Sequence, residues 1–124
     1  MSGPLFDRWS ALKAELPATA RLLAVSKGHP AAATRELAAS GQRHFGESRV
    51  QEALPKQDQL ADLSLSWHFI GRLQSNKVRS VVRAFPVIHS VDSLPLAQRV
   101  SRIAGEEEQR PEVLLQVKLR PDAN

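Results

Sequence analysis

Residues 21–30 read RLLAVSKGHP, and this stretch sets the expected fold. The apolar run at 22–25 predicts a short buried strand, and Pro30 predicts the start of a helix directly after it. Lys27 stands where the strand ends. Barrels of alternating strands and helices carry their reactive groups at that end of each strand. A partly desolvated lysine there can lose its proton and attack an aldehyde to form a Schiff base.

The same alternation of strand and helix continues along the chain. Apolar runs predict strands at about 21–26, 43–46, 66–70, 87–90 and 112–119, the last being the longest. Apolar residues at helical spacing predict helices at about 5–16, 30–40, 48–60, 75–85 and 93–105.

Small polar residues and glycines set the expected helix ends. Gly41 and Gly105 are expected to close the second and fifth helices. Ser93 is expected to cap the fifth helix, and Ser75 or Asn76 the fourth.

Two segments are expected to depart from regular structure. Pro55 lies inside the helical segment 48–60 and is expected to shorten or kink it. The acidic run 106–108 is expected to form a solvated loop.

Successive strand–helix units predict an α/β fold with a parallel sheet. We interpret residues 1–124 as a single partial barrel domain, the N-terminal part (about five βα units) of a TIM-type (β/α)8 barrel. An open, doubly wound sheet with helices on both faces is the alternative. The sequence lacks a G-x-G-x-x-G loop after the first strand, which disfavours the nucleotide-binding version of that alternative.

Composition narrows the class of protein. The 124 residues include no cysteine, so thiolate metal sites and disulfides are excluded. No apolar stretch reaches the roughly 20 residues of a membrane span, and no signal-peptide pattern opens the chain, so we expect a cytoplasmic protein. The net charge of +4 is spread along the chain, and we expect no nucleic-acid partner.

Polar residues collect at the expected carboxyl ends of the strands, where barrel enzymes place function. They are Lys27, Glu47, Ser48, Arg72, His89, Asp92, Lys118 and Arg120. Taken singly, each is equally typical of a solvated strand end. His68 is expected to be a core histidine rather than a proton shuttle. The four histidines have no metal-ligand spacing, so no metal is predicted.

Three segments together resemble one known family. They are AVSK at 24–27, FGESRVQE at 45–52 and WHFIGRLQSNK at 67–77. In order and spacing they are similar to those of the pyridoxal phosphate homeostasis proteins. The resemblance implies a barrel like the N-terminal domain of alanine racemases, with pyridoxal 5′-phosphate held as a Schiff base on Lys27. It also places Ser48 and Ile70 at the cofactor, although Ser48 stands where the family commonly has the longer asparagine.

The resemblance implies a role in intracellular homeostasis of pyridoxal phosphate, without established catalysis. Two alternatives stay open. One is a racemase- or decarboxylase-like enzyme that uses the same Lys27 Schiff base and a second acid/base group. The other is an interaction or nucleic-acid-binding fragment that acts through its positive charge.

The length of the chain affects both fold and site. A complete barrel has eight βα units and about 200 residues or more. The resemblance implies that the phosphate-binding loops belong to the C-terminal half of the family barrel, which we expect to be absent here. We therefore expect weak cofactor binding by a truncated chain, and possible self-association through the open barrel edge.

Overall fold

The computed structural model describes residues 3–117. Its helices are α1 Pro4–Glu15, α2 Ala31–Ser40, α3 Val50–Gln59, α4 Val78–Ala84 and α5 Leu94–Glu106, and a short 3-10 helix, η1 Ser75–Lys77, precedes α4. Its strands are β1 Ala24–Val25, β2 His44–Glu47, β3 Ser66–Phe69, β4 Val87–Val91 and β5 Glu112–Leu115.

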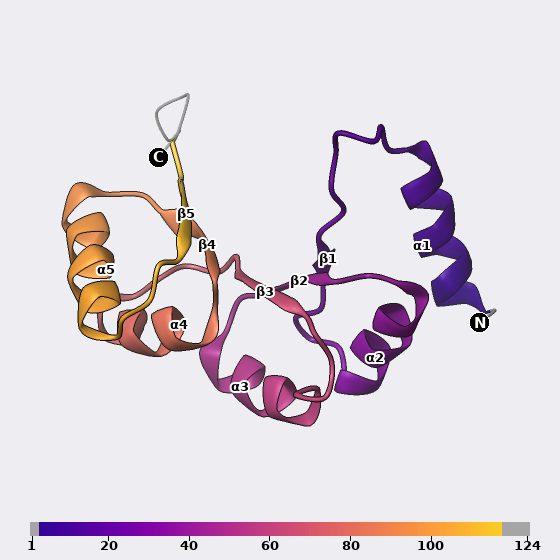
Figure 1. The fold of residues 1–124 in the computed structure, drawn as a ribbon, viewed down its shortest axis with the longest axis horizontal. Helices are drawn as coiled ribbons and strands as arrows, with labels where there is room; N and C mark the ends of the chain where they lie inside the picture. Colours follow the sequence, from indigo (N-terminus) through magenta and orange to yellow (C-terminus); the bar gives the residue numbers. More distant parts are fainter. Residues whose placement is uncertain (1–2, 118–124) are drawn as a thin grey trace, which may run out of the picture.

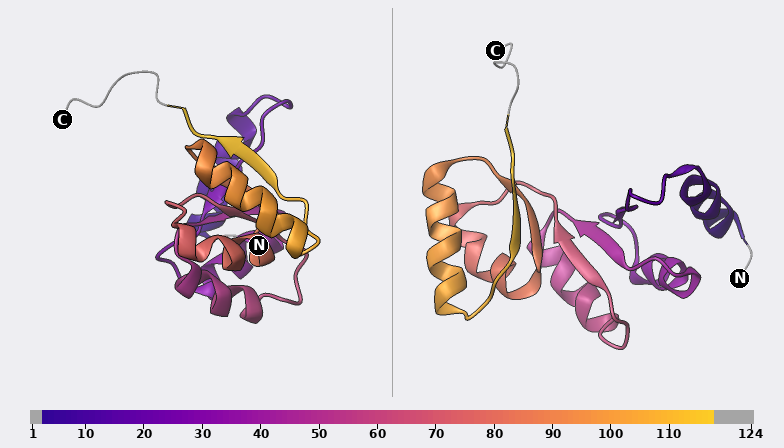
Figure 2. Two further views of the ribbon diagram at one scale, coloured as in Figure 1. Left: turned by 90° about the vertical axis from the view of Figure 1, so that its left-hand side faces the viewer. Right: turned by 45° about the horizontal axis from the view of Figure 1, so that its top comes forward.

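The five strands form one parallel sheet in the order β1-β2-β3-β4-β5. The sheet curves into an open arc, and helices α2 to α5 lie along its outer side (Figure 1; Figure 2). A doubly wound sheet would reverse its strand order and carry helices on both faces. Sequential order with the helices outside is the arrangement of a barrel wall, so the predicted α/β fold class of a TIM-type barrel is confirmed.

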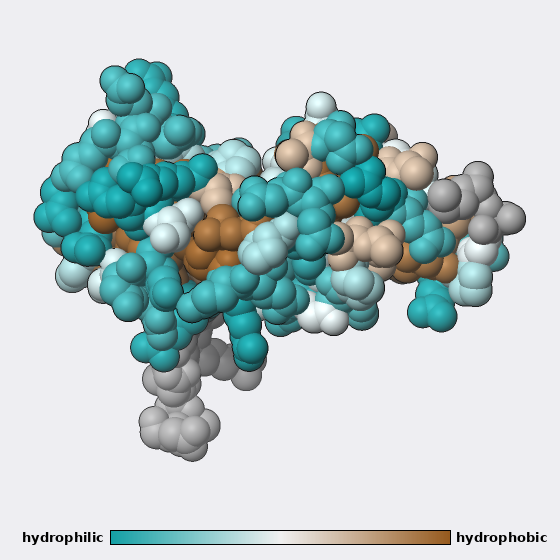
Figure 3. Space-filling model, turned by 90° about the horizontal axis from the view of Figure 1, so that it is seen from below, coloured by the Kyte–Doolittle hydropathy of each residue, from teal (hydrophilic) through white to brown (hydrophobic). Residues whose placement is uncertain are grey.

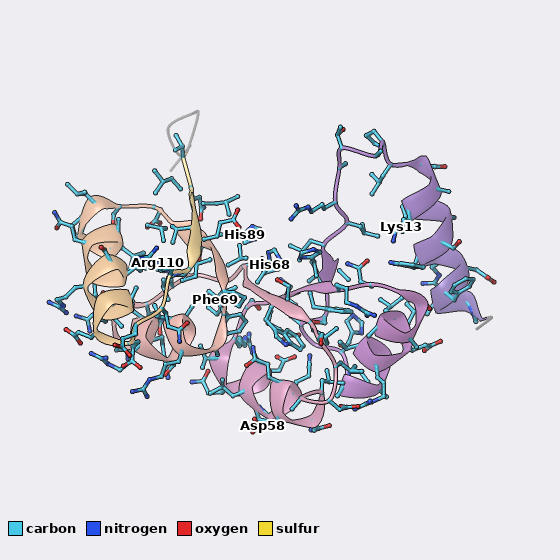
Figure 4. The ribbon with its side chains drawn as sticks, viewed as in Figure 1. Lys13, Asp58, His68, Phe69, His89 and Arg110 are labelled. Atoms are coloured by element: carbon cyan, nitrogen blue, oxygen red, sulfur yellow. The ribbon has the colours of Figure 1, made fainter. Side chains whose placement is uncertain are left out.

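The hydrophobic core lies between the sheet and the outer helices. Phe45, Phe69 and Ile88 leave the strands toward the helices and are almost completely buried. Figure 4 shows Phe69 directed to that side. From α4, Val78 and Val81 meet them from the other side. The outer surface over these helices is largely hydrophilic, with small apolar areas between the elements (Figure 3).

Buried Gln42 joins the N-terminal helix to the sheet. Its side-chain oxygen accepts a hydrogen bond from Trp9 Nε1 at 2.8 Å. Its Nε2 donates to the carbonyl oxygens of Leu22 at 2.6 Å and His44 at 2.8 Å. The chain before β1 is therefore held by a side chain, because no strand pairs with it there.

The outer strands are shorter than their apolar runs predict. The segment 21–26 forms strand only at Ala24–Val25, since the backbone before it bonds to Gln42 instead of to a neighbouring strand. The predicted strand 112–119 is regular over Glu112–Leu115, so β4, with five residues, is the longest strand described. Residues 118 and 119 lie outside the described residues.

Several predicted helix ends are confirmed and others are wrong. Gly41 closes α2, and Ser93 caps α5 by accepting a hydrogen bond from the Leu96 amide. Neither Ser75 nor Asn76 makes a side-chain cap, because η1 begins α4 with backbone bonds.

Pro55 does not shorten α3, which runs on to Gln59. A proline removes one backbone bond from a helix, and the buried face of α3 holds the remaining turns in place. Gly105 does not close α5 either, since the helix continues to Glu106.

The acidic run 106–108 at the end of α5 is not a free loop. Glu106 and Glu107 form ion pairs with Arg79 of α4, and Glu107 also pairs with Arg83. These pairs tie the end of α5 to α4. They hold the pKa of each of the two carboxyl groups below its usual value, chiefly through side-chain hydrogen bonds from the arginines.

None of the helices within residues 3–117 combines the length and the apolar character that crossing a membrane requires. The same residues contribute to one continuous sheet. The assignment of residues 1–124 to one partial barrel domain stays a prediction.

Candidate functional site

The carboxyl ends of β1, β2 and β3 bring the three predicted cofactor-binding residues to one edge of the sheet. Lys27, Ser48 and Ile70 each follow one of these strands. Backbone bonds extend the ladder beyond the strands, from Ser26 N to Gly46 O at 3.0 Å and from Ile70 N to Glu47 O at 2.9 Å. The three segments are therefore held side by side at the point where each strand ends.

Lys27 is exposed and begins a tight turn. Gly28 follows with φ of 77°, a left-handed conformation that side chains other than glycine rarely adopt. The turn is closed by a hydrogen bond from His29 N to Ser26 O at 3.1 Å. The amine is thus carried on a turn, and solvent or a small molecule can reach it.

A buried ionic network lies directly under this turn. Oε2 of Glu47 accepts a hydrogen bond from the Ser26 hydroxyl and one from Nζ of Lys56 at 2.9 Å. Nζ of Lys56 also donates to the Ser26 carbonyl oxygen at 2.9 Å. The side chains of Glu47 and Lys56 are 0% and 6% exposed. Pairing offsets only part of the cost of removing both charges from water.

The sequence-based assignment of Glu47 to the solvated edge is therefore wrong, and Lys56 was not predicted as part of the site. Glu47 faces the helices because its strand alternates, with Phe45 on the same face. Lys56 lies on the helix face that also carries Val50 and Ala53, at three-residue spacing. A lysine on an apolar helical face, behind a strand that ends in glutamate, is the signal that could have revealed the pair.

The loops that carry Ser48 and Ile70 approach each other closely at Gly46 and Gly71. A Cβ on Gly71 would collide with the backbone of Ser48, so only glycine lets the two loops approach this closely. A Cβ on Gly46 would stand 3.0 Å from Cδ1 of Ile70, which covers the glycine. Both predicted residues are partly exposed and lie next to each other, and Lys27 is linked to them through Ser26 and Glu47.

Two of the other predicted polar residues border a hollow that adjoins this site. Arg72 and Asp92 are exposed and line a cavity of about 680 Å³ beyond β3 and β4, which Ile70, Gly71 and Ser90 also line. The hydroxyl of Ser90 is buried and has no hydrogen-bond partner among the described residues. Lys118 and Arg120, also predicted for this edge, lie outside the described residues.

Three histidines form a hydrogen-bonded row across the inner face of the sheet. Nε2 of His68 lies 3.1 Å from Nδ1 of His44, and Nδ1 of His68 lies 2.8 Å from Nε2 of His89. Figure 4 shows His68 and His89 together on the concave side. His89 therefore lies within β4 and not at the edge where it was predicted. Within residues 3–117, no group of three or more acidic or histidine side chains is arranged to hold a metal ion.

The row keeps its central ring neutral. Burial lowers the pKa of His68 to about 4, and the neighbouring His89 and His44 add to that effect. A neutral imidazole donates through one nitrogen and accepts through the other. His68 can therefore bond to both neighbours, which is the behaviour of a satisfied core histidine.

The sheet and its edge belong to a fold that known proteins share. The family model of the alanine racemase N-terminal domain matches residues 3–120. The chain belongs to this family. Its curated relatives include two pyridoxal phosphate homeostasis proteins. The one from Synechocystis sp. is 50% identical over 117 residues, which are 94% of this chain and 54% of that protein.

The second relative, from Pseudomonas aeruginosa, is 54% identical over 114 residues, covering 87% of this chain and 47% of that protein. This family member thus spans about half the length of the curated relatives it matches. The resemblance predicted from the three sequence segments is confirmed.

Solved structures agree with the fold of this family member. PipY from Synechococcus elongatus, solved without PLP, superposes with a TM-score of 0.94 at 56% identity and covers 98% of this chain and 57% of PipY. PipY with PLP bound gives a TM-score of 0.93 at 57% identity, over 97% of this chain and 57% of PipY.

Proposed function

We propose that this chain binds pyridoxal 5′-phosphate through Lys27 and serves intracellular homeostasis of that cofactor without catalysing a reaction. The observation that carries the proposal is the likeness to PipY with PLP bound, which extends over 97% of the chain. The names of the two curated relatives support the homeostatic role.

The residues at the edge of β1 to β3 fit an aldehyde cofactor. Lys27 offers an exposed primary amine at the carboxyl end of β1, on a turn that the backbone closes. Ser48 and Ile70 would border the cofactor from the two neighbouring strands. Gly71 supports this arrangement, because it lets the Ser48 loop lie against the end of β3.

The bound group supplies an aldehyde. Attachment requires Lys27 to present its amine in the unprotonated form, so that its nitrogen bonds to the aldehyde carbon and the aldehyde oxygen leaves as water. Ser48, Ile70 and Gly71 shape the site and take no part in this step. A protein that fixes the aldehyde but offers no second acid/base group opposite it can store the cofactor without racemising an amino acid.

An absorbance titration tests the proposal. Pyridoxal phosphate added to the chain is expected to produce the imine band, and Lys27→Ala is expected to abolish it. Lys13→Ala is the matched control, because Lys13 is an exposed lysine over the ring of Trp9 in α1. An equal imine signal from wild type and Lys27→Ala would refute the assignment of Lys27.

Catalysis is tested separately, with alanine as substrate. The proposal expects no interconversion of L- and D-alanine above the rate given by free pyridoxal phosphate. Racemisation that depends on Lys27 would favour the enzyme alternative.

A further inference from the structure

Two side chains of α3 hold the two peptide groups that flank Lys27. Nζ of Lys56 donates to the carbonyl oxygen of Ser26 at 2.9 Å, on the amino side of Lys27. Oε1 of Glu52 accepts the hydrogen bond of the Gly28 amide at 2.5 Å, on the carboxyl side. The backbone of Lys27 is thus fixed from both directions by one helix.

The two side chains also support each other. Glu52 and Lys56 stand one helical turn apart, with Oε1 and Nζ 3.7 Å from each other. Lys56 is anchored in turn by buried Glu47, which also accepts a hydrogen bond from the Ser26 hydroxyl. The pKa of Glu52 lies below its usual value, chiefly because its carboxylate accepts the hydrogen bond from the Gly28 amide, and the charge of Lys56 adds to this effect. Glu52 therefore accepts that bond as a carboxylate near neutral pH.

The turn needs such support because of its sequence. Gly28 has the greatest backbone freedom of any residue type, and no heavy atom would lie within 4 Å of a Cβ placed on it. Packing therefore does not fix the residue that follows Lys27. The hydrogen bond to Glu52 is a specific constraint that replaces packing at this point.

We propose that Glu52 and Lys56 form a peptide clamp and are positioning residues for Lys27. The inference rests on the proposed function, because it assigns the clamp the task of aiming the Lys27 amine. Neither residue needs to touch the cofactor. Since displacement of a reacting group by about 1 Å can cost about 100-fold in rate, releasing one side of the clamp is expected to slow attachment.

Glu52→Ala tests the clamp with least risk to folding, because the Glu52 side chain is 35% exposed whereas Lys56 is buried. Two readouts are needed, the hydrogen-exchange rate of the Gly28 amide without cofactor and the rate of imine formation with pyridoxal phosphate. We expect Glu52→Ala to speed Gly28 exchange and to slow imine formation by about 10- to 100-fold. Glu52→Gln keeps an oxygen acceptor. It is therefore expected to restore most of the slow Gly28 exchange and most of the rate of imine formation.

Asp58→Ala is the matched control. Asp58 is an exposed carboxylate on the same helix (Figure 4). Among the described residues, its side chain makes no hydrogen bond or ion pair. It is expected to match wild type in both readouts. A second variant, Glu47→Leu combined with Lys56→Met, removes the other side of the clamp as a pair and is expected to slow imine formation as well.

The outcomes separate the clamp from the proposed function. If Glu52→Ala matches Asp58→Ala in Gly28 exchange and in imine rate, the clamp is overturned while Lys27 keeps its role. If Gly28 exchange rises but the imine rate is unchanged, the positioning role is overturned. If wild type forms no imine at all, the proposed function fails and the positioning role fails with it, whereas the exchange result still decides whether the clamp exists.

Discussion

Nζ of Lys56 lies 2.9 Å from Oε2 of Glu47, and both side chains are almost entirely shielded from water. This pair lies between α3 and the end of β2, directly beneath the turn that carries Lys27. The second oxygen of Glu47, Oε1, has no hydrogen-bond partner among the described residues. The pair is therefore a costly feature of the core, and its position beside the candidate site suggests why it is present.

The stability of the chain should depend on Glu47 and Lys56 as a pair. Lys56→Ala leaves a buried carboxylate unpaired, so we expect it to reduce the free energy of unfolding by about 3–5 kcal/mol in urea denaturation. Replacing both charges, by Glu47→Leu with Lys56→Met, should recover most of that loss. A double variant no more stable than Lys56→Ala would show that the hydrogen bond to Ser26, and not charge burial, dominates.

Acid should destabilise the chain through the histidine row. His68 has a pKa of about 4 in the folded chain, below the ordinary value of 6.5. The folded state therefore binds a proton less readily than the unfolded state does, and this contribution to stability is complete above about pH 6.5 and is lost as the pH falls toward 4. Denaturation midpoints measured between pH 7 and pH 4 should decline in this window.

His68→Gln should flatten that decline, because it removes the group with the lowered pKa. His29→Gln is the control, since His29 is exposed in the turn after β1. An unchanged pH profile in His68→Gln would assign the acid sensitivity to other groups.

Gly71 should tolerate no side chain. Gly71→Ala would drive a Cβ into the backbone of Ser48, which cannot move as a flexible side chain can. We expect a loss of about 1–3 kcal/mol in the free energy of unfolding, together with weaker cofactor attachment. Gly105→Ala is the contrasting variant: a Cβ there meets open space within α5, and alanine should stabilise the helix by up to about 1 kcal/mol. Equal changes in the free energy of unfolding of Gly71→Ala and Gly105→Ala would contradict the close approach of Gly71 to the Ser48 backbone.

The last strand should promote self-association of the 124-residue chain. β5 pairs with β4 on one side, and Leu115 at its end is 70% exposed. A strand edge with exposed apolar residues is a template for pairing with another chain. Size-exclusion chromatography should show dimers or larger species, and Leu115→Lys should shift them toward monomer. Leu94→Lys, at a leucine with the same 70% exposure on α5, should not. A wild-type monomer at all concentrations would contradict this prediction.

The order of the elements could be predicted from the sequence because it depends on local pattern. The apolar runs at 66–70 and 87–90 lie within one residue of β3 and β4, and Ser93 caps α5 as its residue type suggests. Lys27, Ser48 and Ile70 also come to one edge, since parallel strands end on the same side.

The parts that could not be predicted depend on partners distant in the sequence. Periodicity places Lys56 on a buried helix face but cannot name Glu47 as the charge that pairs with it there. For the same reason, the sequence did not predict the ion pairs between Glu107 and α4. These pairs fix the end of α5, where a solvated loop was expected. Alternation in β4 could have placed His89 on the inner face, but its bond to His68 needed the register between strands.

Covalent mapping decides whether Lys27 carries the cofactor. The chain is incubated with pyridoxal phosphate, reduced with borohydride to make the bond permanent, digested, and analysed by peptide mass spectrometry. We expect one dominant pyridoxyl-modified peptide, labelled at Lys27, and loss of that label in Lys27→Ala. Modification spread evenly over the exposed lysines, or concentrated on a lysine other than Lys27, would contradict it.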